Sequence, residues 1–298
     1  MTFDAAQFWN CLEGATSEDL ADHENKVIRF SKNDKIWYLK QRASYALSEK
    51  DLRVANLCKE AGFPAAQPFP ADDGQITVNQ DGLWWVLALA LPGDVLTDLA
   101  RENSSWLGAA IAGFHNVFDD ADQSPFPSYD SPLKSLMVRL EKLASRKIET
   151  DQLLSIFEGF QNEDGLTTGI IHRDPHPGNM CFQNGELAGF LDFDLVRRGP
   201  LLFDPCYCAN SQLANFWTRE HEPDRWLDIL TGIMEGYFDT ARPRIDERAH
   251  VYEMLLKAQL TFLVWLYETG QDDTAESNKR RLLWVADKRE LIERGLGL

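Results

Sequence analysis

The sequence has few cysteines and no long apolar segment, and both absences narrow the class of protein. Its five cysteines are odd in number and scattered, at positions 11, 58, 181, 206 and 208. This usage disfavours a disulfide framework and indicates free thiols in a reducing cytoplasm. No segment approaches the roughly 18 consecutive apolar residues of a transmembrane helix. Residues 1–6 also lack the basic and apolar regions of a secretory signal, so we expect a cytoplasmic location.

Basic residues are also scarce. Lysine and arginine number 30 against 47 aspartates and glutamates, which gives a formal net charge of −17. A surface this acidic repels nucleic acid and anionic lipid, so we expect neither nucleic acid nor a membrane as a partner. The composition says nothing about the oligomeric state. The chain of 298 residues is 44% hydrophobic, which is enough for one large or two modest cores.

Two short segments combine acids and an amide in a spacing that suits phosphoryl transfer. Residues 171–179 read IHRDPHPGN and residues 191–194 read LDFD. Asp174 can accept the proton of an attacking hydroxyl. Asn179 and Asp192 can supply oxygen ligands to the Mg²⁺ that neutralises the phosphates of ATP.

The residues between these segments predict a β-hairpin. Two short apolar runs flank an Asn184-Gly185 pair, which is a strong signal for a tight two-residue turn. Such a hairpin would return Asn179 and Asp192 to the same end, within reach of one ion.

The motifs resemble those of the aminoglycoside phosphotransferase and choline kinase superfamily, whose catalytic loop usually reads H-G-D-x-H-x-x-N and whose metal motif usually reads I-D-[FW]-x-x-A. Residues 198–204, RGPLLFD, are similar to the family's G-P-x-x-[YF]-D element. The continuation into residues 208–210, CAN, is closer to the homoserine-kinase-like branch. Arg173 and Pro175 depart from the usual loop, and Arg173 gives the His-Arg-Asp triplet of protein kinases.

The resemblance implies an α+β, protein-kinase-like fold with two lobes, a small antiparallel sheet followed by a mostly helical lobe. The residue patterns agree, since strand-like runs at 26–39 and 75–91 precede helical periodicities beyond residue 93. The same patterns predict a short helix over residues 4–12, a turn at Asn33-Asp34 within the first run, a helix over residues 251–268 and a polar loop over residues 271–279. We expect a nucleotide-binding lobe over residues 1–92 and a helical catalytic and substrate lobe over residues 93–298. The catalytic hairpin is expected within the second lobe.

The resemblance also implies residues that hold ATP. Lys40 ends the apolar strand IWYLK and resembles the strand lysine that contacts the α- and β-phosphates. Its acidic partner on the following helix should be Glu49, with Asp51 as the competitor. Backbone groups from Ala88 to Ala90 should face the adenine. His176 stands where protein kinases place a phosphate-contacting lysine, and a structural role is equally open.

Other positions are less specific. Asp194 can approach the same ion, face the substrate or lie in solvent. Acceptor specificity should come from the helical lobe around Tyr207, Asn210, Trp217 and residues 251–268, although these residues are as easily core. His172 and Asp204 are expected to support the catalytic loop rather than to react.

The nucleotide loop is the weakest part of the pattern. No G-x-G-x-x-G precedes Val27, and the candidate loop, residues 14–26, has a single glycine. The favoured function is an ATP-dependent kinase that phosphorylates a hydroxyl of an amino alcohol, sugar or aminoglycoside, with ATP and Mg²⁺ as cofactors. The alternative is a catalytically silent nucleotide-binding relative. A protein kinase ranks last, because the sequence has no Ala-Pro-Glu segment and no activation-loop-length gap after Asp192.

Overall fold

The computed structural model describes residues 4–20, 26–129, 131–144, 148–158, 160, 165–217, 223–242 and 247–298. The chain divides into two compact units, one comprising Met1–Val95 and Met180–Asp194, the other Leu96–Asn179 and Leu195–Leu298. The sequence analysis placed the catalytic hairpin in the helical lobe, but the structure groups it with the first unit. The reason is backbone pairing, because the hairpin forms a sheet with residues 94–95 of that unit. No helix of the described residues is long and apolar enough to cross a membrane.

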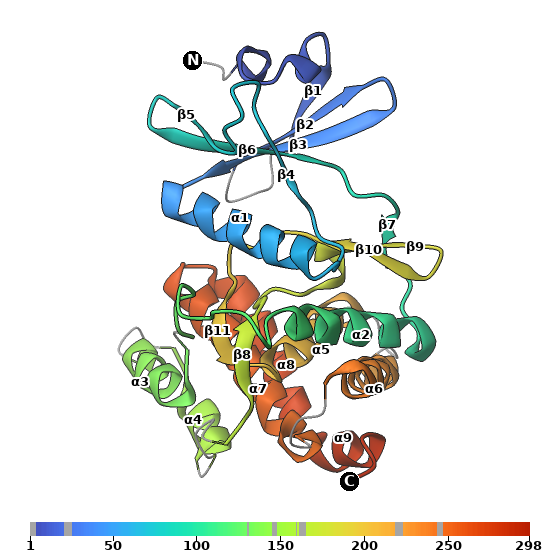
Figure 1. Cartoon of the computed structure of the whole chain (residues 1–298). Coiled ribbons are helices and arrows are strands. Elements are labelled where there is room, and N and C mark those ends of the chain that lie inside the picture. The colour runs from blue at the N-terminus through green and yellow to red at the C-terminus, as the bar shows by residue number, and fades with distance from the viewer. Residues whose placement is uncertain are drawn as a thin grey trace. The chain divides into compact units, whose positions relative to one another are not determined.

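The first unit contains a six-stranded antiparallel sheet with the order β1-β2-β3-β6-β4 and with β5 paired to β6 (Figure 1). Its strands are β1 (Thr16–Leu20), β2 (Val27–Lys32), β3 (Lys35–Arg42), β4 (Pro68–Phe69), β5 (Val78–Gln80) and β6 (Leu83–Leu89). Short 3-10 helices, η1 (Ala5–Gln7) and η2 (Asn10–Leu12), replace the single helix expected there. Trp9 and Leu12 from this segment belong to the core on one face of the sheet.

The β2–β3 hairpin turns at Asn33 and Asp34, as predicted, and both residues have positive φ angles of 49° and 62°. Strand β3 continues to Arg42, so Lys40 lies inside the strand rather than at its end. Helix α1 (Tyr45–Glu60) follows directly. The Ser44 hydroxyl caps it by accepting a hydrogen bond from the Leu47 amide at 3.4 Å.

Strand β1 was not expected, because the segment from residue 14 to 26 had been interpreted as the nucleotide loop. Residues 16–20 instead pair with β2 along their whole length. Four of these five residues are exposed, so the strand lacks the alternation of apolar and polar residues that identifies a half-buried strand. Residues 21–25 of the expected loop lie outside the described residues.

The predicted catalytic hairpin is present. Strands β9 (Met180–Gln183) and β10 (Glu186–Phe190) flank Asn184 and Gly185, whose φ angles of 55° and 82° suit the tight turn. They form a three-stranded sheet, order β10-β9-β7, with β7 (Asp94–Val95). A Cβ atom on Gly93 would lie 2.2 Å from the Phe182 carbonyl oxygen, so only glycine permits this close approach. The register places Phe190 opposite Met180.

The second unit is mostly helical, with one two-stranded sheet. The sheet consists of β8 (Thr168–Ile171) and β11 (Arg197–Pro200), and η3 (Pro177–Asn179) and η4 (Arg248–His250) are 3-10 helices. The α-helices are α2 (Arg101–Val117), α3 (Leu133–Ala144), α4 (Asp151–Phe157), α5 (Phe203–Phe216), α6 (Pro223–Thr240), α7 (Val251–Glu268), α8 (Asp272–Ala286) and α9 (Arg289–Gly295). Helices α2 and α6 pack closely, since a Cβ atom on Gly108 would lie 1.9 Å from the Ile233 carbonyl oxygen.

Most helices agree with the predicted periodicities, and α7 matches its predicted range of 251–268. The polar stretch 271–279 was expected to be a loop, which is wrong, because residues 272–286 form α8. Its buried residues, Ala275, Asn278, Arg281, Leu282 and Val285, recur at helical spacing along one face. Polarity alone therefore misled the interpretation at this point.

Candidate active site

Lys40 lies on one face of the first unit's sheet. It is directly opposite Val27 of β2 and Val86 of β6. Opposed residues of antiparallel strands share a face, so these three side chains lie together. Tyr38, two residues earlier, shares that face and is 38% exposed. Leu39 points to the other face and is fully buried in the core. Tyr38 was not among the predicted site residues, although the two-residue period of the strand places it beside Lys40.

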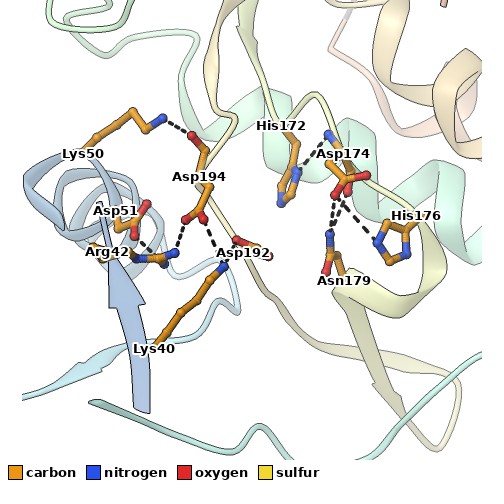
Figure 2. Close-up of polar contacts among 10 residues, drawn as sticks. All are labelled: Lys40, Arg42, Lys50, Asp51, His172, Asp174, His176, Asn179, Asp192 and Asp194. Carbon is orange, nitrogen blue, oxygen red and sulfur yellow. Dashed lines mark hydrogen bonds and ion pairs between the residues drawn. The ribbon is translucent and has the colours of Figure 1, made fainter. Parts of the chain in front are cut away.

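The ammonium group of Lys40 is held by the two acids of the LDFD motif (Figure 2). Its Nζ atom lies 2.5 Å from Oδ1 of Asp192 and 3.0 Å from Oδ2 of Asp194. The expected partner was instead an acid of the following helix. Glu49 is exposed on α1, and among the described residues no ion pair joins Lys40 to Glu49 or Asp51. The lysine is thus partnered by the metal motif rather than by the helix.

Arg42, on β3, links helix α1 to the segment that contains Asp192 and Asp194. One guanidinium nitrogen of Arg42 lies 2.5 Å from Oδ2 of Asp51, and another forms an ion pair with Asp194. The Lys50 ammonium donates to the carbonyl oxygen of Asp194. Burial raises the pKa of Asp51 to about 6, although the charge of Arg42 acts in the opposite direction. Figure 2 shows Arg42 and Lys50 contacting Asp194, and Asp51 contacting Arg42.

The two acids of the motif differ in exposure. The side chain of Asp192 is 38% exposed and that of Asp194 is 19% exposed. Asp192 has a φ of 60°, a left-handed conformation that is rare for residues other than glycine and that often marks functional sites. Asp194 binds the cations of its own unit, which favours a supporting role over the substrate contact considered from the sequence.

Asp204 fixes the catalytic loop of the second unit by accepting hydrogen bonds from two of its backbone amides. One carboxylate oxygen accepts the amide of His172 at 2.7 Å, and the other accepts the amide of Arg173 at 2.9 Å. Arg173 has a φ of 72°, so the loop turns sharply just before Asp174. Asp204 is completely buried, which agrees with the scaffolding role expected from the sequence.

Two residues that the sequence analysis missed extend this support. Nε2 of His115, on α2, lies 2.9 Å from Oδ2 of Asp204, and Nδ1 of His115 lies 3.1 Å from the hydroxyl of Tyr237, on α6. His115 is 1% exposed and Tyr237 is 3% exposed. Nothing in the local sequence marks His115, because a single histidine on a buried helix face has no characteristic spacing.

Asp174 is surrounded by residues of its own loop. Nδ2 of Asn179 donates to the Asp174 carbonyl oxygen at 2.9 Å and to its Oδ2 at 3.3 Å. The His176 ring lies 3.8 Å from the same carboxylate (Figure 2). Nδ1 of His176 also accepts a hydrogen bond from the Gly178 amide at 3.0 Å. The Asp174 side chain remains 27% exposed, so a substrate hydroxyl can reach it. The contact of His176 with phosphate stays a prediction.

The residues expected to set acceptor specificity have different roles. Burial, and then the nearby charge of Asp174, raise the pKa of Tyr207. Asn210 is buried and donates to the Leu255 carbonyl oxygen at 2.8 Å, which joins α5 to α7. Trp217 packs edge-on against Trp284. Of this group, Tyr207 is the residue whose pKa responds to the expected catalytic acid.

The expectation that backbone groups from Ala88 to Ala90 face the adenine stays a prediction. The Ala90 amide donates to the Ile36 carbonyl oxygen at 2.9 Å, so this amide already has a partner within the first unit. Ala88 lies between two neighbours, opposite Tyr38 of β3 and Pro68 of β4. Its side chain shares the face of Tyr38 and Lys40, because opposed and alternate residues lie on one face.

The donor atoms suit a hard cation. Because Nδ2 of Asn179 faces Asp174, its amide oxygen is the atom that remains for a metal. In the first unit, Asp192 presents a partly exposed carboxylate. No group of three histidines, cysteines or acids gathers as a metal site within the described residues. Mg²⁺ sites in proteins commonly use one or two carboxylates together with phosphate oxygens and water. Whether Asn179 and Asp192 share one ion stays a prediction.

Comparison with known families identifies the chain. The model of the phosphotransferase enzyme family matches residues 17–248, which include the catalytic loop, the LDFD motif and Lys40. The chain belongs to this family. The resemblance predicted from the loop and the metal motif is therefore confirmed.

Two homoserine kinases are similar in sequence to this chain over part of their length. A homoserine kinase of Gluconobacter oxydans is 32% identical over 100 residues, covering 33% of this chain and 30% of the relative. A homoserine kinase of Rhizobium etli is 25% identical over 222 residues, covering 70% of this chain and 65% of the relative. The chain thus spans less than two thirds of the length of these relatives.

A solved structure of the amicoumacin kinase hAmiN, in complex with AMP-PNP and Ca²⁺, superposes with a TM-score of 0.70 at 17% identity. The match covers 95% of this chain and 91% of that one. This similarity confirms the predicted protein-kinase-like α+β fold.

Proposed function

We propose that this member of the phosphotransferase enzyme family transfers the γ-phosphate of Mg-ATP to a hydroxyl group of a small molecule. The observation that carries the proposal is the environment of Asp174. Its partly exposed carboxylate lies on a loop that Asp204 holds through two backbone amides. A carboxylate fixed in this way can orient an acceptor hydroxyl and accept its proton.

The reaction follows from these groups. The acceptor hydroxyl donates a hydrogen bond to Asp174, and its oxygen attacks the γ-phosphorus in line with the oxygen that leaves with ADP. The new O–P bond forms as the old one breaks, and the proton passes to Asp174 late in the transfer. Asn179, whose Nδ2 lies 3.3 Å from Oδ2 of Asp174, supports the orientation of the carboxylate.

Lys40 supplies positive charge to the phosphates from the first unit. Its ammonium is paired with Asp192 and Asp194, so the phosphates must compete with these acids for it. Mg²⁺ bound by Asp192 and Asn179 would neutralise the charge of the phosphates. Val27, Tyr38, Val86 and Ala88, on the face of Lys40, are suited to contact the adenine.

The acceptor is an amino alcohol, a sugar or an aminoglycoside. The curated relatives support the first class, because those reported above are named homoserine kinases. The structural neighbour supports a wider range, since it is named as a kinase of amicoumacin. Homoserine is therefore the first acceptor to test.

The direct test measures ADP release from Mg-ATP by the purified chain with homoserine, choline, a hexose and an aminoglycoside, each against a reaction without acceptor. We expect one acceptor to raise the rate clearly and to yield a phosphomonoester by ³¹P NMR. Equal rates with and without every acceptor, together with nucleotide binding, would support the silent relative instead. The observation that favours this second candidate is the single glycine in residues 14–26, where a glycine-rich phosphate-binding loop would have several.

A further inference from the structure

Lys40 and Arg42 point to the same side of β3, because alternate residues of a strand share a face. Each takes one oxygen of the same carboxylate. Nζ of Lys40 lies 3.0 Å from Oδ2 of Asp194, and Nη1 of Arg42 forms an ion pair with Oδ1. The Asp194 carboxylate therefore bridges two cations of one strand.

Arg42 has a second partner on α1. Its Nη2 lies 2.5 Å from Oδ2 of Asp51, and the side chains of both residues are 7% exposed. The neighbouring Lys50 donates to the main-chain oxygen of Asp194. The 192–194 segment is thus tied to α1 by a side chain and by a backbone contact, both shown in Figure 2.

The charges in this cluster balance, with three cations (Lys40, Arg42 and Lys50) facing three acids (Asp51, Asp192 and Asp194). Removing one member of a buried pair leaves an uncompensated charge. A guanidinium presents several donors in a rigid fork and can hold two carboxylates at once, whereas a lysine ammonium is a single point charge. Arginine at position 42 is therefore not interchangeable with lysine.

We propose that Arg42 is a positioning residue for phosphate transfer by this chain. By holding Asp51 and Asp194 together, it fixes the 192–194 segment and, through Asp194, the ammonium of Lys40. This inference rests on the proposed function. It assigns Asp194 to the support of Lys40 and leaves the more exposed Asp192 for the metal. When nucleotide binds, Lys40 exchanges Asp192 for phosphate while Arg42 keeps Asp194 in place.

The test compares Arg42→Lys and Asp51→Asn with two controls on the same helix, Arg53→Lys and Glu60→Gln, whose side chains are exposed. Calorimetry measures the dissociation constant of ATP with Mg²⁺ and with EDTA, and thermal unfolding without ligand reports folding. Steady-state kinetics with an active acceptor separates kcat from KM.

We expect Arg42→Lys to weaken Mg-ATP binding or to lower kcat by about 10–100-fold, the usual effect of removing support from around a metal site. Its affinity for ATP in EDTA should change less, because the supported segment carries a metal ligand. Asp51→Asn should act in the same direction but less strongly, since the ion pair between Arg42 and Asp194 remains. Both controls should match the wild type.

Equal Mg²⁺ dependence and equal kcat in wild type and Arg42→Lys would overturn the inference alone, as would a variant that changes only the unfolding temperature. If Arg42→Lys does not fold, Asp51→Asn carries the same test. A wild type that binds no Mg-ATP would overturn the proposed function and this inference with it.

Discussion

The Nζ atom of Lys40 lies 2.5 Å from Oδ1 of Asp192, although 152 residues separate them in the sequence. The pair joins the sheet of the first unit to the LDFD motif that follows the hairpin. A nucleotide must displace this pair, because its phosphates require the ammonium and its metal requires the carboxylate. Substitution of either residue should therefore alter nucleotide binding more than folding.

Lys40→Met should lower turnover or raise the ATP concentration required, because the phosphates lose their cation. The small loss of packing from a partly exposed side chain should leave the first unit folded. Thermal unfolding gives the measurement, since a ligand at ~100 times its dissociation constant stabilises by about 2.7 kcal/mol. Wild type should gain this stabilisation from Mg-ATP and the variant much less. Equal stabilisation of both would exclude Lys40 from nucleotide binding.

Asp192→Asn and Asn179→Ala should each weaken the Mg²⁺-dependent part of nucleotide affinity. The effect should be larger for Asp192→Asn, because it removes a charge beside a divalent ion. We expect a loss of at least about tenfold for Asp192→Asn, the lower end of what disturbing a metal site costs. The measurement is a Mg²⁺ titration of ATP affinity. Titrations identical to that of the wild type would show that neither residue binds the metal.

His115→Ala should destabilise the second unit, because it leaves the Asp204 carboxylate and the Tyr237 hydroxyl without their shared buried partner. Leaving a buried polar group unsatisfied costs about 1–3 kcal/mol. Urea unfolding measures the loss, and His250→Ala, at an exposed histidine, is the matched control. If both variants unfold at the same urea concentration, the His115 contacts contribute nothing to stability.

Asp51 should make stability depend on pH in a defined direction. Its pKa is about 6 in the folded chain against an ordinary 3.8, so between these values the folded chain holds a proton that the unfolded chain has released. Stability from this group is therefore present below pH ~4 and lost as pH rises through about 6. The full effect is on the order of 3 kcal/mol, from the size of the pKa shift.

The measurement is the difference in unfolding free energy between wild type and Asp51→Asn at pH 4.5 and pH 7.5. The unfolding free energy of the wild type, relative to that of the variant, should be larger at pH 4.5 than at pH 7.5. A difference that does not change with pH would mean that burial does not raise this pKa.

The local parts of the site were predictable because short-range geometry determines them. The Asn184-Gly185 turn sets the register of the hairpin, and the apolar strand before Lys40 identifies that lysine. Arg42 and His115 were not predictable in the same way. The partner of His115 is 89 residues away, and no local spacing encodes such a contact.

The fold shows the same limit. Strand β1 was missed because its residues are mainly exposed, and a strand of this kind is defined by pairing with β2 rather than by its own pattern. Helix α8 was missed because its polar face dominates the composition of residues 271–279. The pairing of Lys40 was assigned to the wrong element, since helical phase could not decide between Glu49 and Asp51 and neither is the partner found.

The most direct test of the account is the transfer rate of Asp174→Ala, measured with saturating Mg-ATP and an acceptor that the wild type phosphorylates. Loss of the general base should lower the rate by a factor on the order of 10²–10⁴. ATP affinity measured by calorimetry should survive, because Asp174 contacts the acceptor rather than the nucleotide. A variant that retains nearly wild-type turnover would contradict the assignment of Asp174 and the mechanism built on it.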